Sequence, residues 1–331
     1  MQESSNKQAA EDLIQQSLNR EAMKRERFTQ ILPFVGIILL VTFFTLTTGG
    51  RFVAVENLKL LLNQCFTMAI VMVGAIFLYS LGSLDMAIGQ VLGVSSLVLA
   101  VLYNLGLPIL FCLLAGILVA VGFMCITATA KNYLKLNPFI ASLCVSNISS
   151  GIVVAVAKQG KITFPYSKAP WLNNTSTKVL VLIALILIGY VLYNYTGFGK
   201  SLKAIGGSPV VARISGIKVE KVTYLAYILI GVMIGISALF TVARSGAVDP
   251  SVGSSMNLNV MIAIVLGGFP LSGGANARFS APLIGALMVT VLTNGLAMMG
   301  QANALGYGIK GLLFIIVVAL TYEKSKGKLI D

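Results

Sequence analysis

The segment TGFGKSLKAIGGSPVVARISGIKVEKV, residues 196–222, separates two long apolar runs and is rich in glycine and in basic side chains. Its basic residues are Lys200, Lys203, Arg213, Lys218 and Lys221. Basic residues of membrane proteins collect in loops on the cytoplasmic side. The segment therefore predicts a cytoplasmic loop that is long enough to make a contact of its own.

The loop carries the local signals of two short helices. The first is expected to end at Gly206 or Gly207, because glycine readily adopts the left-handed conformation at a helix C-terminus. Ser208 is a suitable N-cap for the second helix, Pro209 fits its first position and Gly216 would close it.

The second of these helices is expected to have one apolar face. Helical spacing places Val210, Val211 and Ile214 together and directs Arg213 away from them. Such a helix either fits a groove in a partner protein or lies on the lipid surface.

The composition indicates a polytopic membrane protein with an all-α fold. Of 331 residues, 57% are hydrophobic and 11% are charged, whereas soluble domains carry about 25% charged residues. We predict about ten membrane spans, because apolar runs close to the roughly 20 residues that cross a bilayer recur from Leu32 onward. The eighth of these spans is short for a full crossing. The expected spans are 31–48, 58–80, 86–104, 107–129, 138–157, 177–195, 222–243, 257–271, 279–299 and 306–322.

The expected organisation is one membrane domain between two short cytoplasmic ends. The arm 1–28 is charged and unlike a signal peptide, so the first span should remain in the mature protein. The membrane domain would cover 29–323 and the tail 324–331. This topology leaves both termini in the cytoplasm and places most of the basic residues there.

The net charge of +13 is interpreted as topology charge rather than as a nucleic-acid surface, because the basic residues lie at span ends and in loops. The longest external loop, 158–177, would carry Tyr166 and Trp171 as interfacial anchors. Its lysines run against the tendency of basic residues to lie on the cytoplasmic side. An acidic soluble partner is therefore expected to dock there. These lysines are Lys158, Lys161 and Lys168.

No catalytic or metal site is predicted. The chain has no histidine, and its four cysteines lack metal-binding spacing. The stretch FGKS resembles the end of a phosphate-binding loop, but Asn194 occupies the position of the first glycine. Asp85 is the one acidic residue expected at membrane depth, and this scarcity argues against an ion-coupled carrier.

Two glycine-rich stretches at span ends, SLGSLDMAIGQVLG (80–93) and VLGGFPLSGGANARF (265–279), predict unwound segments within the membrane. As a set, uncharged polar side chains inside the spans suit a neutral, hydroxyl-rich solute, although for any single one a role in joining helices is favoured. They lie at residues 63, 64, 67, 95, 96, 146, 147, 149, 150, 290, 293 and 294.

Five motifs in order make the sequence resemble the permeases of ribose- and xylose-type ABC importers, within the branched-chain amino acid and sugar permease superfamily. GSLDMAIG (82–89) is similar to the family's Gly-Gly-Ile-Asp-Leu-Ser-Val-Gly, with departures at Ser83 and Ala87. The others are LNPFIASL (136–143), FGKSLKAIGGSPVVARISGI (198–217), LGGFPLSGG (266–274) and LTNGLAMMG (292–300). In LGGFPLSGG, Phe269 and Pro270 replace the family's Thr and Ser.

The resemblance implies a fold like that of the vitamin-type (type II) importers, in a bacterial inner membrane. It implies a second permease subunit, two ATP-binding subunits or one fused tandem ATPase that hold ATP and Mg²⁺, and an external solute-binding protein. This chain itself would bind no cofactor. The solute is expected to be a ribose-like pentose or a hexose; the alternatives are a nucleoside or autoinducer-type solute, or ion-coupled transport.

The resemblance also implies two groups of site residues, and catalytic residues are in neither. The expected ATPase-coupling residues are Gly199, Ala204, Gly206, Gly207, Ala212, Arg213 and Gly216. The expected pathway or re-entrant residues are Asp85, Gly89, Asn147, Gly267, Gly268, Gly273, Gly274 and Asn294.

Overall fold

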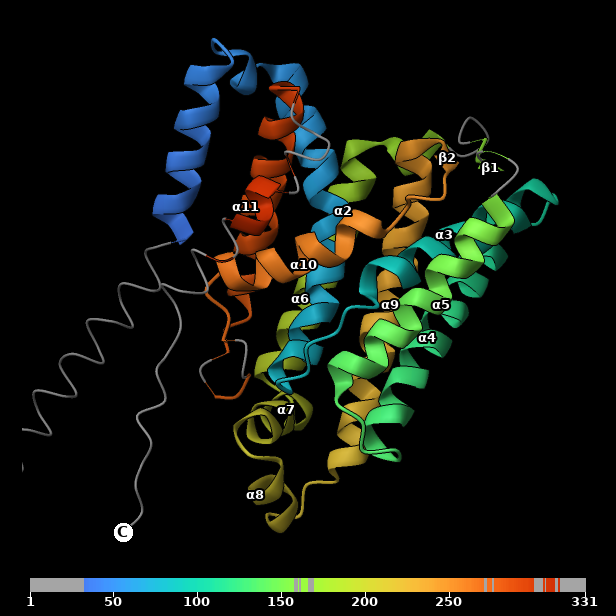
Figure 1. The fold of residues 1–331 in the computed structure, drawn as a ribbon, viewed down its shortest axis with the longest axis vertical. Coiled ribbons are helices and arrows are strands. Elements are labelled where there is room, and N and C mark those ends of the chain that lie inside the picture. The colour runs from blue at the N-terminus through green and yellow to red at the C-terminus, as the bar shows by residue number, and fades with distance from the viewer. Residues whose placement is uncertain are drawn as a thin grey trace, which may run out of the picture.

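A computed structural model describes residues 33–157, 160, 162–165, 170–270, 273–275, 277–300, 306, 308–312 and 315. The regular secondary structure of this part of the chain is helical apart from two short strands, β1 (Ile162–Thr163) and β2 (Ala247–Val248). The strands pair antiparallel, with Ile162 opposite Val248. They lie at one end of the molecule in Figure 1, opposite the end that holds α7 and α8.

Six of the described helices are long and apolar enough to cross a membrane. They are α2 (Val55–Ser80), α4 (Ile109–Asn132), α5 (Pro138–Ala157), α6 (Thr175–Asn194), α9 (Val219–Ser245) and α11 (Ser280–Met298). Three shorter apolar helices are Pro33–Thr47, α3 (Ile88–Asn104) and α10 (Ser254–Leu266). The remaining helical elements are η1 (Arg51–Val53), η3 (Pro170–Asn173), α7 (Gly197–Gly207) and α8 (Pro209–Ile214).

The all-helical prediction is confirmed, and nine of the expected spans coincide with these helices within a few residues. The short eighth span is α10. Most of the expected tenth span, 306–322, and the whole of the arm and tail lie outside the described residues. The external lysines at 158, 161 and 168 and Tyr166 also lie outside them.

The centre of the bundle is α9, which packs between α2 and α4. The crossing of α9 and α4 depends on two glycines one turn apart. A Cβ on Gly231 would lie 2.7 Å from Val121 Cα, and one on Gly235 would lie 2.6 Å from Ile117 Cα. Small residues spaced four apart allow two helices to approach this closely.

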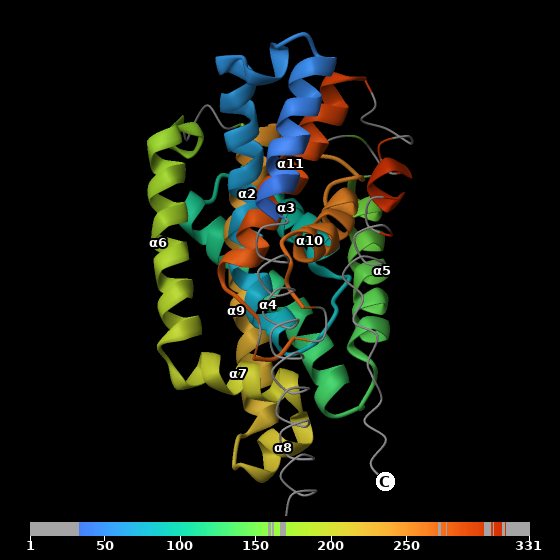
Figure 2. The same ribbon diagram turned by 90° about the vertical axis from the view of Figure 1, so that its left-hand side faces the viewer.

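Two elements leave the pattern of upright helices. Figure 1 shows α10 lying across the molecule, and Figure 2 shows it nearly end-on. In Figure 2, α6 stands at one side of the bundle and α5 at the other. Both helices expose large apolar side chains over much of their length, including Leu187 at 58% and Ile148 at 57%. Such faces suit contact with lipid or with a second subunit.

The two glycine-rich stretches do interrupt the helices, as predicted. The described residues between Ser80 and Ile88 are not helical, and neither are the described residues between Leu266 and Ser280. Left-handed backbone occurs at Gly82 (φ 65°), Gly273 (φ 70°) and Gly274 (φ 91°), a conformation that side-chain-bearing residues rarely adopt.

Candidate functional site

The loop between α6 and α9 folds into α7 and α8 at one end of the bundle (Figure 1). Thr196 caps α7, because its Oγ1 accepts a hydrogen bond from the amide of Gly199 at 3.4 Å. Ser208 caps α8 by accepting from the amide of Val211 at 3.4 Å, and Pro209 is the first helical residue. The predicted start of the second helix is confirmed.

The predicted end of the first helix is wrong in its mechanism. Neither Gly206 nor Gly207 has a left-handed backbone, and α7 ends at an extended Ser208 with φ −161°. Glycine is required at 206 for another reason. A Cβ there would lie 2.0 Å from the carbonyl oxygen of Ser80 and 2.5 Å from the amide nitrogen of Gly274. Gly206 therefore permits a close backbone contact rather than a helix end.

The second helix has the expected apolar face, and this face is exposed. Val210, Val211 and Ile214 are 68%, 61% and 82% exposed, whereas Ala212 is 2% exposed. Arg213 forms an ion pair with Glu220 in the first turn of α9, away from these side chains. The apolar face of α8 is thus available to a partner, whereas Ala212 holds the helix to its own chain.

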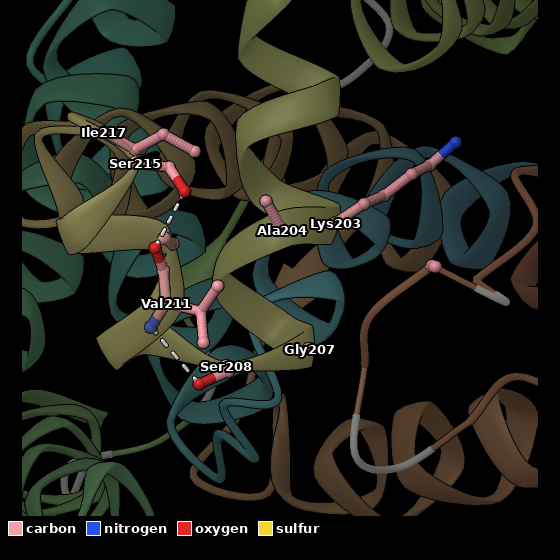
Figure 3. Close-up of a pocket in the computed structure, with 9 residues that line it drawn as sticks. Lys203, Ala204, Gly207, Ser208, Val211, Ser215 and Ile217 are labelled. Carbon is pink, nitrogen blue, oxygen red and sulfur yellow. Dashed lines mark hydrogen bonds between the residues drawn. The ribbon is translucent and has the colours of Figure 1, made fainter.

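A hollow of about 370 Å³ lies between α7 and α8. Figure 3 shows Ala204 from α7 and Val211 from α8 at this hollow, with the Ser208 cap and the bond from Ser215 to the Val211 carbonyl. Its lining residues are Lys203, Ala204, Gly207, Ser208, Val211, Ala212, Ser215, Ile217 and Ala275. Three of the predicted coupling residues, Ala204, Gly207 and Ala212, therefore lie together.

The other predicted coupling residues divide between the interior and the surface. A Cβ on Gly199 would lie 1.9 Å from the carbonyl oxygen of Tyr193, so Gly199, like Gly206, faces the helix bundle. Gly216 follows α8 with φ 83° and has open space around it. Arg213 is exposed on α8.

The two glycine-rich stretches meet beneath α7, which the sequence did not predict. The amide of Gly274 donates to the carbonyl oxygen of Ser80 at 3.1 Å. A Cβ on Gly273 would lie 2.4 Å from the same oxygen. Ser80 at the end of α2 thus contacts Gly206 of α7 and the segment that leads into α11.

Asp85 lies in the non-helical segment between α2 and α3 and is 2% exposed. Its Oδ1 accepts a hydrogen bond from the amide of Ala87 at 2.7 Å, at the start of α3. Its Oδ2 has no hydrogen-bond partner within the described part of the chain. Tyr79 donates to the Asp85 carbonyl oxygen at 3.2 Å. The carboxylate orients the start of α3, since an acceptor there satisfies a free helix amide.

Two further helices hold the same segment. Lys131, near the end of α4, donates a hydrogen bond from Nζ to the Ser83 hydroxyl. The amide of Met86 donates to Ser142 Oγ of α5 at 2.9 Å. The unwound segment is therefore fixed by side chains from α4 and α5, which covers its backbone as a membrane interior requires.

The predicted pathway residue Gly89 packs α3 against α10. A Cβ on Gly89 would lie 2.3 Å from the carbonyl oxygen of Gly253. The amide of Gly89 donates to Asn257 Oδ1 at 2.5 Å, and Asn257 Nδ2 donates to Ser146 Oγ at 3.4 Å. Asn257 therefore joins α10 to both α3 and α5.

The remaining pathway candidates lie in different settings. A Cβ on Gly267 would lie 2.0 Å from the carbonyl oxygen of Ala281, and Gly268 turns the chain with φ 76°. Asn294 is 2% exposed within α11, whereas Asn147 is exposed on α5. Of these residues, Asn147 has the exposure that a solute or a second subunit could use.

Two buried lysines went unnoticed in the sequence. Lys178 is 5% exposed and donates to Asn63 Oδ1 at 2.7 Å and to Asn173 Oδ1 at 3.2 Å. Lys310 is 6% exposed and donates to Asn259 Oδ1 at 3.1 Å. The sequence signal that could have identified them is a lysine inside or beside an apolar run. A lysine in such a place is buried, and a buried ammonium group needs hydrogen-bond acceptors from neighbouring segments. Both lysines connect helices.

The described residues offer no cluster of three or more acidic, cysteine or histidine side chains that could hold a metal. The cysteines in the same part of the chain form no disulfide bond.

Comparison with known proteins identifies the family. Residues 57–318 match the family described as branched-chain amino acid transport system, permease component. The ribose import permease protein RbsC of Bacillus subtilis (strain 168) is 28% identical over 300 residues, which span 88% of this chain and 92% of the relative.

Two further relatives match at similar length. The fructose import permease protein FrcC of Rhizobium meliloti is 26% identical, over 87% of this chain and 84% of the relative. The xylose transport system permease protein XylH of Escherichia coli (strain K12) is 26% identical, over 90% and 92%. With its long apolar helices, the chain therefore belongs to this family of membrane permease components and has a non-catalytic role.

Proposed function

We propose that this chain is the transmembrane subunit of an ATP-driven ABC importer for a neutral monosaccharide. The observation that carries the proposal is the structure of the 196–222 loop: α7 is seated on both glycine-rich segments while α8 presents Val210, Val211 and Ile214 outward. An ATPase subunit that binds α8 and moves it would displace both glycine-rich segments through α7. The names of the ribose, fructose and xylose permeases support the solute class.

The proposed topology places α7 and α8 in the cytoplasm and the β1–β2 pair outside. The chain would cross the membrane ten times, with α3 and α10 as short elements beside unwound segments and a last span over 306–322. This arrangement follows the basic residues of the α7–α8 loop, because such residues are retained on the cytoplasmic side. Both termini would then be cytoplasmic.

The proposed ATPase contact is the apolar face of α8 together with the 370 Å³ hollow beside it. Ile214, which is 82% exposed, suits a groove in a partner, because burying a large aliphatic side chain contributes about 1.5–3 kcal/mol. Ala204 and Gly207 border the hollow and leave room for a side chain of the partner. ATP and Mg²⁺ would be held by that partner, as would the hydrolytic chemistry.

The proposed solute path lies between two permease subunits. Asn147 and Gly151 are exposed on α5, and a second subunit opposite this face would enclose a small polar surface. An amide offers a donor and an acceptor to a sugar hydroxyl without introducing a charge. The external binding protein would deliver the solute at the opposite end from α8.

The test is uptake by the complete complex. The chain would be expressed with the ATPase, second permease and binding-protein genes beside it and reconstituted in proteoliposomes. We expect ATP-dependent uptake of radiolabelled ribose, fructose or xylose, with no requirement for an ion gradient. A nucleoside would be assayed in parallel. Uptake that survives ATP depletion but ends when the ion gradient is collapsed would overturn the importer assignment.

A further inference from the structure

One side chain, Tyr193 near the end of α6, contacts every element of the junction beneath α7. Its ring packs edge-on against Phe77 of α2, with centroids 5.9 Å apart, and its centroid lies 5.9 Å from that of Phe279. The ammonium group of Lys203 on α7 lies 4.4 Å from the ring centroid. Tyr193 therefore joins α2 and α7 to the segment that leads into α11.

The Tyr193 hydroxyl makes two buried polar contacts in the same place. It lies 2.8 Å from Ser80 Oγ and donates to the carbonyl oxygen of Ala277 at 3.1 Å. Ser80 Oγ also reaches the carbonyl oxygen of Ile76 at 2.7 Å. Ser80 and Tyr193 are both 0% exposed, so water does not substitute for a lost partner.

The two hydroxyl groups have too few protons for three hydrogen bonds. Each hydroxyl carries one donor hydrogen, but the contacts join Ser80 to Ile76, Ser80 to Tyr193 and Tyr193 to Ala277. When Tyr193 donates to Ser80, the Ala277 carbonyl is released and both hydroxyl hydrogens are still used. The contact with Ala277 can thus be exchanged with no buried donor left unpaired, and the cost of the exchange is limited to the Ala277 carbonyl oxygen, which loses this donor.

The backbone around this pair is in direct contact with α7. Gly206 of α7 approaches the Ser80 carbonyl oxygen, which also accepts a hydrogen bond from Gly274. Gly199 of α7 approaches the Tyr193 carbonyl oxygen. A displacement of α7 must therefore move Ser80, Tyr193 or both, because close-packed backbone contacts leave no free volume.

We propose that the Tyr193–Ser80 pair is a switch that transmits movement of α7 to the segment between α10 and α11. In this role both are positioning residues: Tyr193 donates to Ala277 in one state and to Ser80 in the other, which holds or frees the start of α11. The inference rests on the proposed importer function, since it assigns the residues through which the coupling loop acts on the transmembrane helices.

The first experiment measures local opening in the purified permease. Tyr193→Phe removes the hydroxyl and keeps the ring contacts. The matched control is Tyr195→Phe, because Tyr195 is 71% exposed and its hydroxyl makes no hydrogen bond within the described residues. We expect backbone hydrogen exchange in peptides covering 273–283 to rise about fivefold or more in Tyr193→Phe and to stay unchanged in the control. Equal exchange in both variants would overturn the proposal.

The second experiment measures coupling in the complete complex in proteoliposomes. We expect Tyr193→Phe to retain basal ATP hydrolysis and to lower the amount of solute imported per ATP by about fivefold. A purely structural role would lower yield, hydrolysis and uptake together and leave that ratio constant, which would overturn the switch. Ser80→Ala should produce a similar loss, and the double variant should be no worse than the more severe single variant, because both changes remove one shared bond.

These measurements separate the two levels of inference. If the wild-type complex imports no solute with ATP, the proposed importer function fails, and the switch fails with it. If the wild-type complex imports solute but Tyr193→Phe keeps the normal ratio and normal hydrogen exchange, the switch alone is wrong. Additive losses in the double variant would also contradict it, since independent residues add.

Discussion

The adjacent helices α7 and α8 are held in opposite ways. In α7, Leu202 and Ile205 are buried, and two glycines press the helix backbone against Tyr193 and Ser80. In α8, by contrast, Ala212 is buried while the larger apolar side chains point outward. One loop thus contains a helix that packs against the rest of the permease and a helix whose apolar face is exposed.

A loop built in this way can transmit a force from its exposed helix to the helix bundle. The spacing of Gly199, Leu202 and Gly206 places these residues on one face of α7, because positions three, four and seven apart share a side of a helix. The opposite arrangement in α8 leaves a face that only another protein or lipid can cover. A force applied to α8 would reach the bundle through α7, and the following variants test that division.

The largest expected effect is at the buried side of α7. Gly206→Ala would place a Cβ 2.0 Å from the Ser80 carbonyl oxygen, and neither backbone can move aside easily. We expect a loss of about 2–3 kcal/mol in stability or an unfolded product. Thermal unfolding of the purified protein in detergent, followed by size-exclusion chromatography, measures this.

The matched control is the next residue. A Cβ on Gly207 would meet nothing within 4 Å and its φ is not left-handed, so Gly207→Ala should unfold within a degree or two of the wild type. If both variants behave alike, α7 is not seated on Ser80 and the comparison between the helices is broken.

A similar free-energy change is expected at α8, but in binding rather than in folding. Ile214 is 82% exposed, so Ile214→Asp should change stability by less than about 0.5 kcal/mol. If Ile214 enters a groove of the ATPase subunit, losing it costs about 2 kcal/mol, a roughly thirtyfold lower affinity. Co-purification and titration with the ATPase subunit measure the loss.

Val53→Asp is a suitable control for Ile214→Asp. Val53 is also exposed, at 46%, in η1 at the opposite end of the molecule. We expect that variant to retain ATPase binding. Normal binding by Ile214→Asp would show that α8 faces lipid instead, as the other interpretation of its apolar face requires.

The helices and the local structure of the loop could be predicted from the sequence. Apolar runs and helix caps are local signals, so the span limits, Ser208 and Pro209 were predicted closely. The contacts of Gly206 could not be predicted. A glycine at a helix end can either end the helix in a left-handed conformation or allow a close backbone contact, and the sequence does not show which distant segment lies beside it. The left-handed cap was expected, whereas the distant Ser80 carbonyl is what excludes a side chain.

The same limit applies to the candidate site. Both glycine-rich stretches were identified, but their meeting at Ser80 depends on how α2, α7 and α11 pack. Nothing in the sequence distinguishes Tyr193 from other aromatic residues near the ends of spans. Its importance lies in contacts with Phe77, Lys203 and Ala277, which come from three separate parts of the chain.

A smaller effect is expected at the exit from α8. Gly216 has φ 83° and open space around it, so a β-branched residue is opposed by the backbone alone. Gly216→Val should cost about 1–2 kcal/mol locally and lower solute-stimulated ATP hydrolysis about fivefold, with normal membrane insertion. Gly216→Asn should retain most of the activity, because asparagine tolerates the left-handed region. Equal losses in the two variants would point to side-chain size rather than backbone conformation.

The smallest effect is expected at the ion pair between α8 and α9. The side chains of Arg213 and Glu220 are 62% and 48% exposed, so solvent and salt screen their attraction, and such pairs contribute about 0–1 kcal/mol. Glu220→Gln should therefore leave thermal unfolding nearly unchanged and alter stimulated ATP hydrolysis less than twofold, with the difference fading as salt is raised. A loss as large as that of Gly216→Val would mean that the ion pair, rather than buried Ala212, sets the orientation of α8. The contrast between a buried α7 and an exposed α8 would then depend on surface charge, and it would weaken as the ionic strength rises.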